Sequence, residues 1–122
     1  MPIELRNISG TEIAILTGPG KQIIDVPSAL DLAITVKHET GAAKIAIEKE
    51  AIADEFFILS SGFAGEILQK FVNYQIQAAI YGDFSHYTSK PLLDFIRESN
   101  RGGHFFFVPT QEEAIRALLH CK

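Results

Sequence analysis

This sequence has little cysteine, no long apolar run and no basic leader, and each shortage excludes a class of protein. Cys121 is the single cysteine among 122 residues, so no intrachain disulfide can form and nothing indicates an oxidising compartment. No apolar run approaches the ~20 residues that a membrane-spanning helix needs. The chain opens without a basic segment followed by a long apolar stretch, which argues against a signal peptide. We therefore expect a cytoplasmic protein that does not engage a membrane.

The sequence also lacks the signals of nucleic-acid, metal and cofactor binding. Its formal net charge is -4, and its eleven lysines and arginines are scattered singly, so no basic stripe is present to bind nucleic acid. The four histidines show no metal-ligand spacing. No phosphate-binding loop, dinucleotide fingerprint or Gly-x-Ser-x-Gly elbow occurs. We expect no metal, no cofactor and no nucleic-acid partner.

What the sequence does contain is typical of one globular domain. Its length falls within the common range for a single domain, which we expect to span residues 1–122. Hydrophobic residues make up 47% of the chain and charged residues only 21%, which excludes a disordered tail. The chain is long enough to bury one core without disulfides or metals.

The order of apolar patterns predicts an α/β fold. Residues 3–8 and 13–16 read as a hairpin turning at Ser9-Gly10, and Ser28 reads as the cap of a helix that Gly41 ends. After this the pattern alternates between helices and short apolar runs that are typical of buried strands. The later strands are expected at 44–47, 76–81 and 105–108, and the later helices at 62–74, 89–103 and from Thr110 onward. We predict a mixed, mostly parallel sheet of about five strands with an edge hairpin and helices after the later strands.

Three long stretches carry a family resemblance. Residues 56–74, 79–85 and 95–102 resemble the bacterial family catalogued as domain of unknown function 4180. More distantly, the element order is similar to the sulfate transporter and anti-sigma-factor antagonist (STAS) fold, as is Leu59-Ser60-Ser61-Gly62-Phe63 opening a helix. This second resemblance implies that Ser61 is the serine that a partner kinase phosphorylates to switch binding. Leu59 stands where those antagonists carry an acidic residue.

Polar residues in two segments are the candidate site. In an open parallel sheet, the loops at the carboxyl ends of the strands form the ligand crevice, which here would join residues 60–65, 82–89 and 109–110. Ser61 is either a phosphorylation site, because a helix start stabilises negative charge, or a plain cap. Glu66, Lys70 and Asn73 form a polar stripe on the same helix, which together with Ser60 is either a partner or ligand surface or a solvated face.

The second segment follows the strand expected at 76–81. It contains Asp83, Ser85, His86 and Tyr87 within one short loop. An aspartate and a histidine this close can act as an acid–base pair, although a turn-forming aspartate bonded to its own backbone is the common alternative.

These patterns favour a non-catalytic regulatory module that binds a protein partner. The alternative is an enzyme for a small ligand that uses Glu66, Asp83 or His86 as acid–base groups. A third hypothesis is a subunit whose purpose is oligomerisation, and the sequence leaves a homodimer open. A deep pocket over these residues would favour the enzyme, and a shallow face the binding module.

Overall fold

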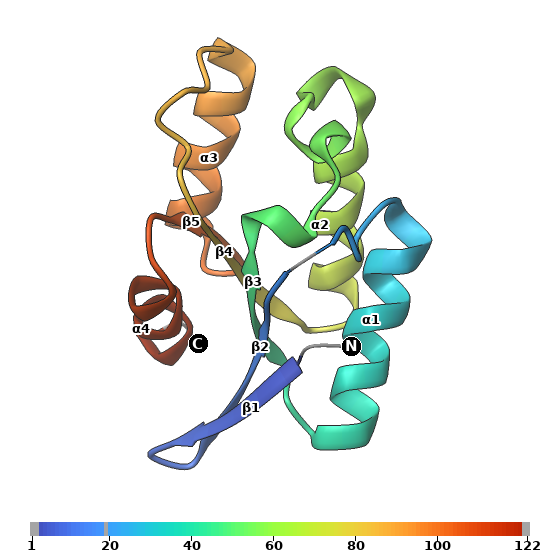
Figure 1. Ribbon diagram of the computed structural model, residues 1–122, viewed down its shortest axis with the longest axis vertical. Helices are drawn as coiled ribbons and strands as arrows, with labels where there is room; N and C mark the ends of the chain where they lie inside the picture. The colour runs from blue at the N-terminus through green and yellow to red at the C-terminus, as the bar shows by residue number, and fades with distance from the viewer. Residues whose placement is uncertain (1–2, 19, 121–122) are drawn as a thin grey trace.

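A five-stranded mixed sheet forms the centre of the molecule, as the sequence predicts (Figure 1). The structure is a computed structural model that describes residues 3–18 and 20–120. Strand order follows chain order: β1 (Ile3–Ile8), β2 (Thr11–Leu16), β3 (Lys44–Glu48), β4 (Gln77–Tyr81) and β5 (Phe105–Val108). β1 pairs antiparallel with β2 in an edge hairpin, and every later pairing is parallel.

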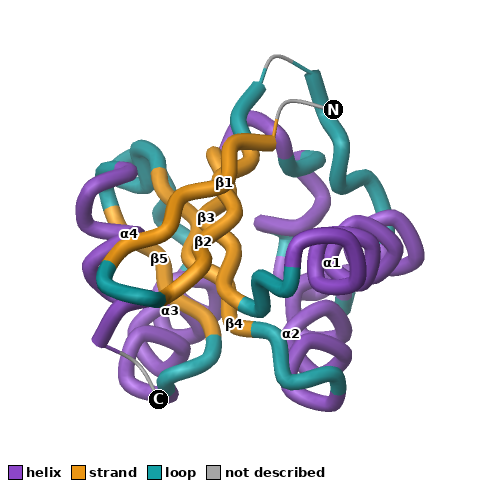
Figure 2. Tube along the Cα trace, turned by 90° about the horizontal axis from the view of Figure 1, so that it is seen from below, coloured by secondary structure: helices purple, strands orange, loops and turns teal. Residues whose placement is uncertain are grey.

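A helix follows each parallel strand. The four helices are, in chain order, α1 (Val26–Thr40), α2 (Phe63–Asn73), α3 (Lys90–Gly102) and α4 (Gln111–His120). Figure 2 shows α1 and α2 on one side of the sheet and α4 on the other. α3 belongs to the core of the first side and runs beside β5. Within the described residues no helix is long and apolar enough to cross a membrane.

The start of α1 corrects one detail of the prediction. Asp25, and not Ser28, is the N-cap: the Asp25 carboxylate accepts a hydrogen bond from the Ser28 N–H at 2.8 Å. The Ser28 hydroxyl in turn accepts from the Asp25 N–H at 3.1 Å, so the two residues form a reciprocal capping box. Val26 and Pro27 occupy the first two helical positions, which suits proline because those N–H groups have no helical acceptor. Gly41 ends the helix as predicted.

The sheet divides the interior into two cores. The larger core lies under α1, α2 and α3 and contains the predicted row Phe63, Ile67 and Phe71 from α2. In the neighbouring row of α2, Ala64 is buried but Val72 is 37% exposed. The smaller core packs α4, through residues such as Ala114 and Leu118, against the opposite face of the sheet. Each parallel strand is therefore covered on both faces, which explains the unbroken apolar runs in the sequence.

Between β3 and α2 the chain forms three short 3₁₀ helices, Lys49–Ala51, Asp54–Phe57 and Leu59–Ser61. Phe56 and Phe57 lie on the second of these and return to the larger core. Phe56 is 1% exposed and packs edge-on against Phe63 of α2, with ring centroids 5.8 Å apart. This aromatic packing holds the start of α2 at the carboxyl edge of the sheet.

Candidate functional site

Two hollows lie where the parallel strands end, the edge at which the sequence predicts a crevice. One, of about 490 Å³, is lined by residues 82–85 and Pro109, which follow β4 and β5. The other, also about 490 Å³, is lined by residues 57–60 together with Ser89 and Pro91. The 82–89 segment borders both hollows, so the structure brings Ser60, Asp83 and Ser85 to one edge of the molecule.

Ser61 lies at this edge just before α2. Its hydroxyl donates to the Glu55 carbonyl at 3.1 Å and accepts from the Phe63 N–H at 3.2 Å. The N-cap position itself belongs to Gly62, whose φ of 80° is the left-handed conformation that glycine adopts without steric penalty. Ser61 therefore performs the capping bond that the plain interpretation requires, from one residue further out, and it remains exposed.

The stripe of Glu66, Lys70 and Asn73 leads away from this edge. An 11-residue helix is about 16 Å long, so Asn73 lies near the opposite edge of the sheet. Asn73 accepts a hydrogen bond from Gln69 at 3.0 Å. Glu66 and Lys70 form no ion pair with each other in the described part of the chain. The stripe is thus separate from the 83–87 loop, and only the Ser60 and Ser61 end of α2 shares its edge.

The 83–87 loop is organised by its own hydrogen bonds. The Asp83 carboxylate accepts from the Ser85 hydroxyl at 2.6 Å and from the Ser85 N–H at 2.9 Å. The hydroxyl bond, with the N–H bond next in weight, lowers the pKa of Asp83 below its ordinary value. The His86 ring instead lies against Tyr87, with centroids 4.4 Å apart. Asp83 and His86 are not hydrogen-bonded to each other, so an oriented acid–base pair is not assembled there.

Lys49 joins this loop, and sequence reasoning missed it. Its ammonium donates to the Asp83 carbonyl at 3.0 Å and lies 4.9 Å from the centroid of the Tyr87 ring. The rings of Phe57 and Phe84 are 6.0 and 5.9 Å away, so three aromatic rings surround one cation. The available signal was a lysine placed directly after a buried strand, opposite the glycine that follows the next strand.

Gly82 makes this approach sterically feasible. Its φ is 155°, and a Cβ added there would stand 2.7 Å from the Lys49 Cβ. The lysine stem therefore lies directly against the backbone that leaves β4, and it leaves no room for a side chain at position 82. The edge is therefore a fixed cluster, in which Lys49, Gly82 and the 83–87 loop hold one another.

On the α4 side of the same edge lies Tyr81, which is buried and carries a hydroxyl group. Its hydroxyl accepts from the Gln111 side chain at 3.1 Å. Burial raises the pKa of Tyr81, and the Gln111 bond opposes that rise. Nearby, the Glu48 carboxylate accepts from the Gly18 N–H at 3.3 Å. These contacts fasten loops to the sheet, and we assign them a structural role.

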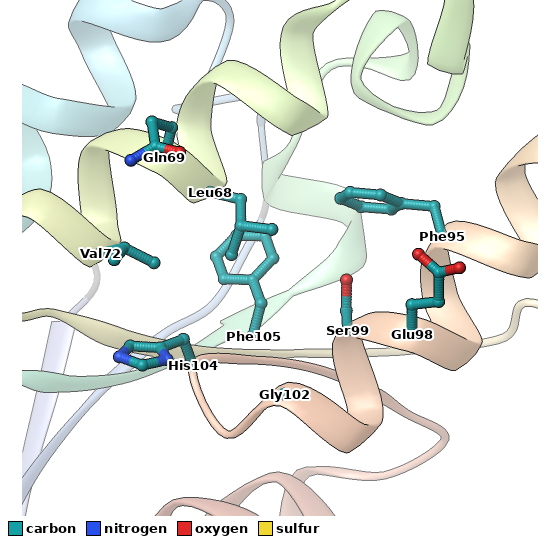
Figure 3. Close-up of a pocket in the computed structure, with 9 residues that line it drawn as sticks. All are labelled: Leu68, Gln69, Val72, Phe95, Glu98, Ser99, Gly102, His104 and Phe105. Carbon is teal, nitrogen blue, oxygen red and sulfur yellow. The ribbon is translucent and has the colours of Figure 1, made fainter.

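A third hollow, of about 260 Å³, opens between α2 and α3 at the opposite edge (Figure 3). Leu68, Val72, Phe95 and Phe105 form its apolar walls, and the Ser99 hydroxyl points into it. Ser99 is only 7% exposed. No sequence pattern indicates this groove, because helical spacing shows which face of a helix is apolar and not how far apart two helices lie. Among the described residues, no group of three His, Cys, Asp or Glu side chains is placed to hold a metal ion.

Together, the sheet and its edge define a small α/β domain with shallow, open hollows and a fixed polar loop at the carboxyl ends of its strands. The chain belongs to the family described as domain of unknown function (DUF4180), which matches residues 8–118. This confirms the family resemblance seen in the sequence. No curated protein and no solved structure matches the chain.

Proposed function

We propose that this chain is a non-catalytic regulatory module that binds a protein partner through the carboxyl edge of its sheet. The working surface consists of residues 58–61, at the start of α2, and the 83–87 loop. The observation that carries the proposal is the exposed Ile58, which is 55% accessible beside the open hollow that joins this segment to Ser89. Phe57, Leu59 and Pro91 line the same hollow together with Ile58, so the apolar surface here is contiguous and is bordered by Ser60 and Ser89. A contiguous apolar patch with a polar rim is typical of a protein-binding surface.

The shape of this edge favours a partner over a small substrate. Both hollows are open, and the loop that would supply acid–base groups engages Asp83 with Ser85 and His86 with Tyr87. A small-ligand enzyme needs convergent groups within an enclosed pocket. A protein partner needs only a fixed, exposed surface, which the cluster around Lys49 supplies.

Ser61 is the proposed switch of this surface. The element order resembles that of the anti-sigma-factor antagonists, and Ser61 stands at the position of their phosphorylated serine. Phosphate there would add nearly two negative charges beside the backbone N–H groups that open α2, where negative charge is stabilised. The fold should tolerate the modification, while the surface next to Ile58 becomes negatively charged.

The test compares wild type with Ser61→Ala, Ser61→Asp and Ile58→Asp. Ser9→Asp is the matched control, because it adds the same charge to the exposed turn between β1 and β2, away from the carboxyl edge of the sheet. We expect Ser61→Ala to lower stability by about 1 kcal/mol, because it removes the hydroxyl that caps Phe63. Ser61→Asp and Ile58→Asp should keep the fold and change which proteins of the native host are recovered, whereas Ser9→Asp should not.

Quantitative mass spectrometry of proteins retained by each immobilised variant gives the measurement, with melting temperature as the folding control. The intact mass of the protein isolated from its host reports phosphorylation, and its absence from Ser61→Ala produced in the same host assigns the phosphate to Ser61. If wild type and all four variants retain the same partners, the working surface lies elsewhere. If only Ile58→Asp loses partners, the surface stands and the switch at Ser61 is discarded.

A further inference from the structure

The outer edge of β1 carries backbone groups that no other described strand meets. β1 is the first strand of the sheet and pairs only with β2 in the described part of the chain. Its turn is Ser9-Gly10, with φ values of 53° and 88°, which is the two-residue hairpin turn that keeps strand pairing in strict register. Ile8 and Thr11 flank this turn as partners.

This turn determines which residues of β1 face outward. In an antiparallel hairpin, pairs alternate between those that exchange backbone hydrogen bonds and those that do not, and the pair next to a two-residue turn does. Ile8, Arg6 and Glu4 therefore bond to β2. The N–H and C=O groups of Ile3, Leu5 and Asn7 point away from β2, toward the open edge.

Side chains of opposite charge flank Leu5 on β1. Leu5 is 45% exposed and borders a groove of about 300 Å³ between β1 and α1, with Ile3, Leu32 and Val36 among its walls. Glu4 and Arg6 flank Leu5 and project to the opposite face, where the Arg6 Nε lies 2.7 Å from a Glu4 oxygen. Their side chains are 59% and 43% exposed, so both remain accessible to a partner although they pair with each other within the strand.

We propose that β1 pairs antiparallel with β1 of a second copy of this chain, about a two-fold axis at Leu5. In this register Leu5 meets Leu5 of the second copy, and Ile3 meets Asn7, so only outward-facing residues exchange backbone bonds. Glu4 of each copy lies opposite Arg6 of the other, which gives two cross-strand pairs of opposite charge. The sheet then runs continuously through both copies, and the two Leu5 side chains cover the groove beside α1.

The charges select this register. Centring the axis on Glu4 or Arg6 would place like charges opposite each other and would oppose residues already bonded to β2. Centring it on Asn7 would leave Glu4 and Arg6 without charged partners. A second copy is the occupant that matches this edge, because the sequence from Ile3 to Asn7 is complementary to itself in charge.

The expected dimer is weak. Two short strands exchange about six backbone hydrogen bonds and bury less area than a standard stable interface. We therefore expect dissociation constants on the order of micromolar or weaker, with tighter association at low salt. This pairing does not depend on the proposed function, since the carboxyl-edge surface remains open in the dimer.

The test is sedimentation equilibrium across a concentration series from about 1 µM to several hundred micromolar, centred on the expected affinity. Glu4→Arg and Arg6→Glu each turn both cross-strand pairs repulsive and should weaken dimerisation about tenfold or more. The double variant Glu4→Arg/Arg6→Glu restores opposite charges in the same register and should recover wild-type affinity. Glu98→Arg, on the distant α3, is the matched charge control and should leave dimerisation unchanged.

A backbone variant tests the register independently of charge. Leu5→Pro removes an N–H that points outward, so it should abolish dimerisation while preserving the hairpin. Arg6→Pro removes a bond to β2 instead and should lower the melting temperature. A wild-type chain that stays monomeric at every concentration overturns the proposal. So does a dimer that the single charge reversals leave intact, or that the double variant fails to restore.

Discussion

The two edges of the sheet differ in whether their outward backbone groups have hydrogen-bond partners within the described chain. At β5, α3 runs alongside the strand, and the Asn100 side chain bonds the outward backbone groups of Phe107. The Asn100 carbonyl oxygen accepts from the Phe107 N–H at 2.7 Å, and its amide donates to the Phe107 carbonyl at 3.2 Å. At β1 no described side chain serves the outward groups in this way. One edge is thus closed by the molecule itself, and the other is left available.

The interiors beside the two edges differ as well. The β5 side is filled with aromatic rings, and Phe105 packs edge-on against Phe71 with centroids 5.7 Å apart. The β1 side offers the partly exposed Leu5 over a groove. A closed edge and a dense interior occur together because a helix can cover an edge strand only where side chains fill the space between them. Two predictions sharpen this comparison, and a third with a smaller effect concerns the loop after β4.

The largest effect is expected from paired alanine substitutions in the two interiors. Phe71 is 1% exposed, so Phe71→Ala should lower the free energy of unfolding by about 3–5 kcal/mol. Leu5→Ala, at a position 45% exposed, should lower it by less than about 1 kcal/mol. Denaturant unfolding below the dimerisation range gives both values. Similar losses for the two variants would show that the β5 side is not the denser one.

The next effect concerns closure of the β5 edge. Asn100→Ala leaves the N–H and C=O of Phe107 without their partners and should lower stability by about 1–3 kcal/mol. The variant should also aggregate more readily, because a second edge becomes open to pairing. Asn73→Ala is the control, since the Asn73 side chain bonds the Gln69 side chain within the same helix and serves no sheet edge. An equal change in melting temperature for both variants would remove the closing role of Asn100.

The smallest effect lies in the loop after β4. Ser85→Ala removes the strongest of the bonds that lower the pKa of Asp83, so that pKa should rise toward its ordinary value. A lowered carboxyl pKa stabilises the fold above the unfolded-state pKa, and this contribution is lost as pH falls through the folded-state value. The variant should therefore lose less stability on acidification than wild type does.

Titration of the carboxyl groups by NMR measures this pKa directly. Asp94 is the internal control, because its pKa is lowered mainly by a hydrogen bond from Lys90, in which Ser85 takes no part. An Asp83 pKa that stays at its wild-type value in Ser85→Ala would assign the effect to other groups around the loop.

Much of the fold was predictable because its signals are local. Apolar periodicity placed α2, and the doubly apolar runs placed β4 and β5 with their parallel pairing. The sequence favours Ser28 as the cap of α1, whereas Asp25 occupies that position; both residue types cap helices, and the bonds between Asp25 and Ser28 are reciprocal. The three 3₁₀ helices between β3 and α2 carry no periodicity of their own, since their positions depend on where Phe56 and Phe57 pack.

The candidate site was predictable only as far as topology determines it. The rule that loops gather at the carboxyl ends of parallel strands placed Ser60 and Asp83 at one edge. It could not reveal the ring cluster around Lys49, which depends on side-chain directions from three separate segments. The separation of Asn73 from that edge, in contrast, follows from helix length, because an 11-residue helix that begins at the edge carries its last residue about 16 Å away.

The position of α4 bears on how the chain is made. α4 is the only described helix of the smaller core, where it covers Ile13, Ile15, Ala46 and Ala79. During synthesis the other crossover units can dock in order, each against the strand made just before it, so their contacts form early. The second face of the sheet, however, stays apolar and uncovered until α4 leaves the ribosome. The nascent domain therefore exposes an aggregation-prone apolar surface late in translation, at the stage when chaperones bind unfinished chains.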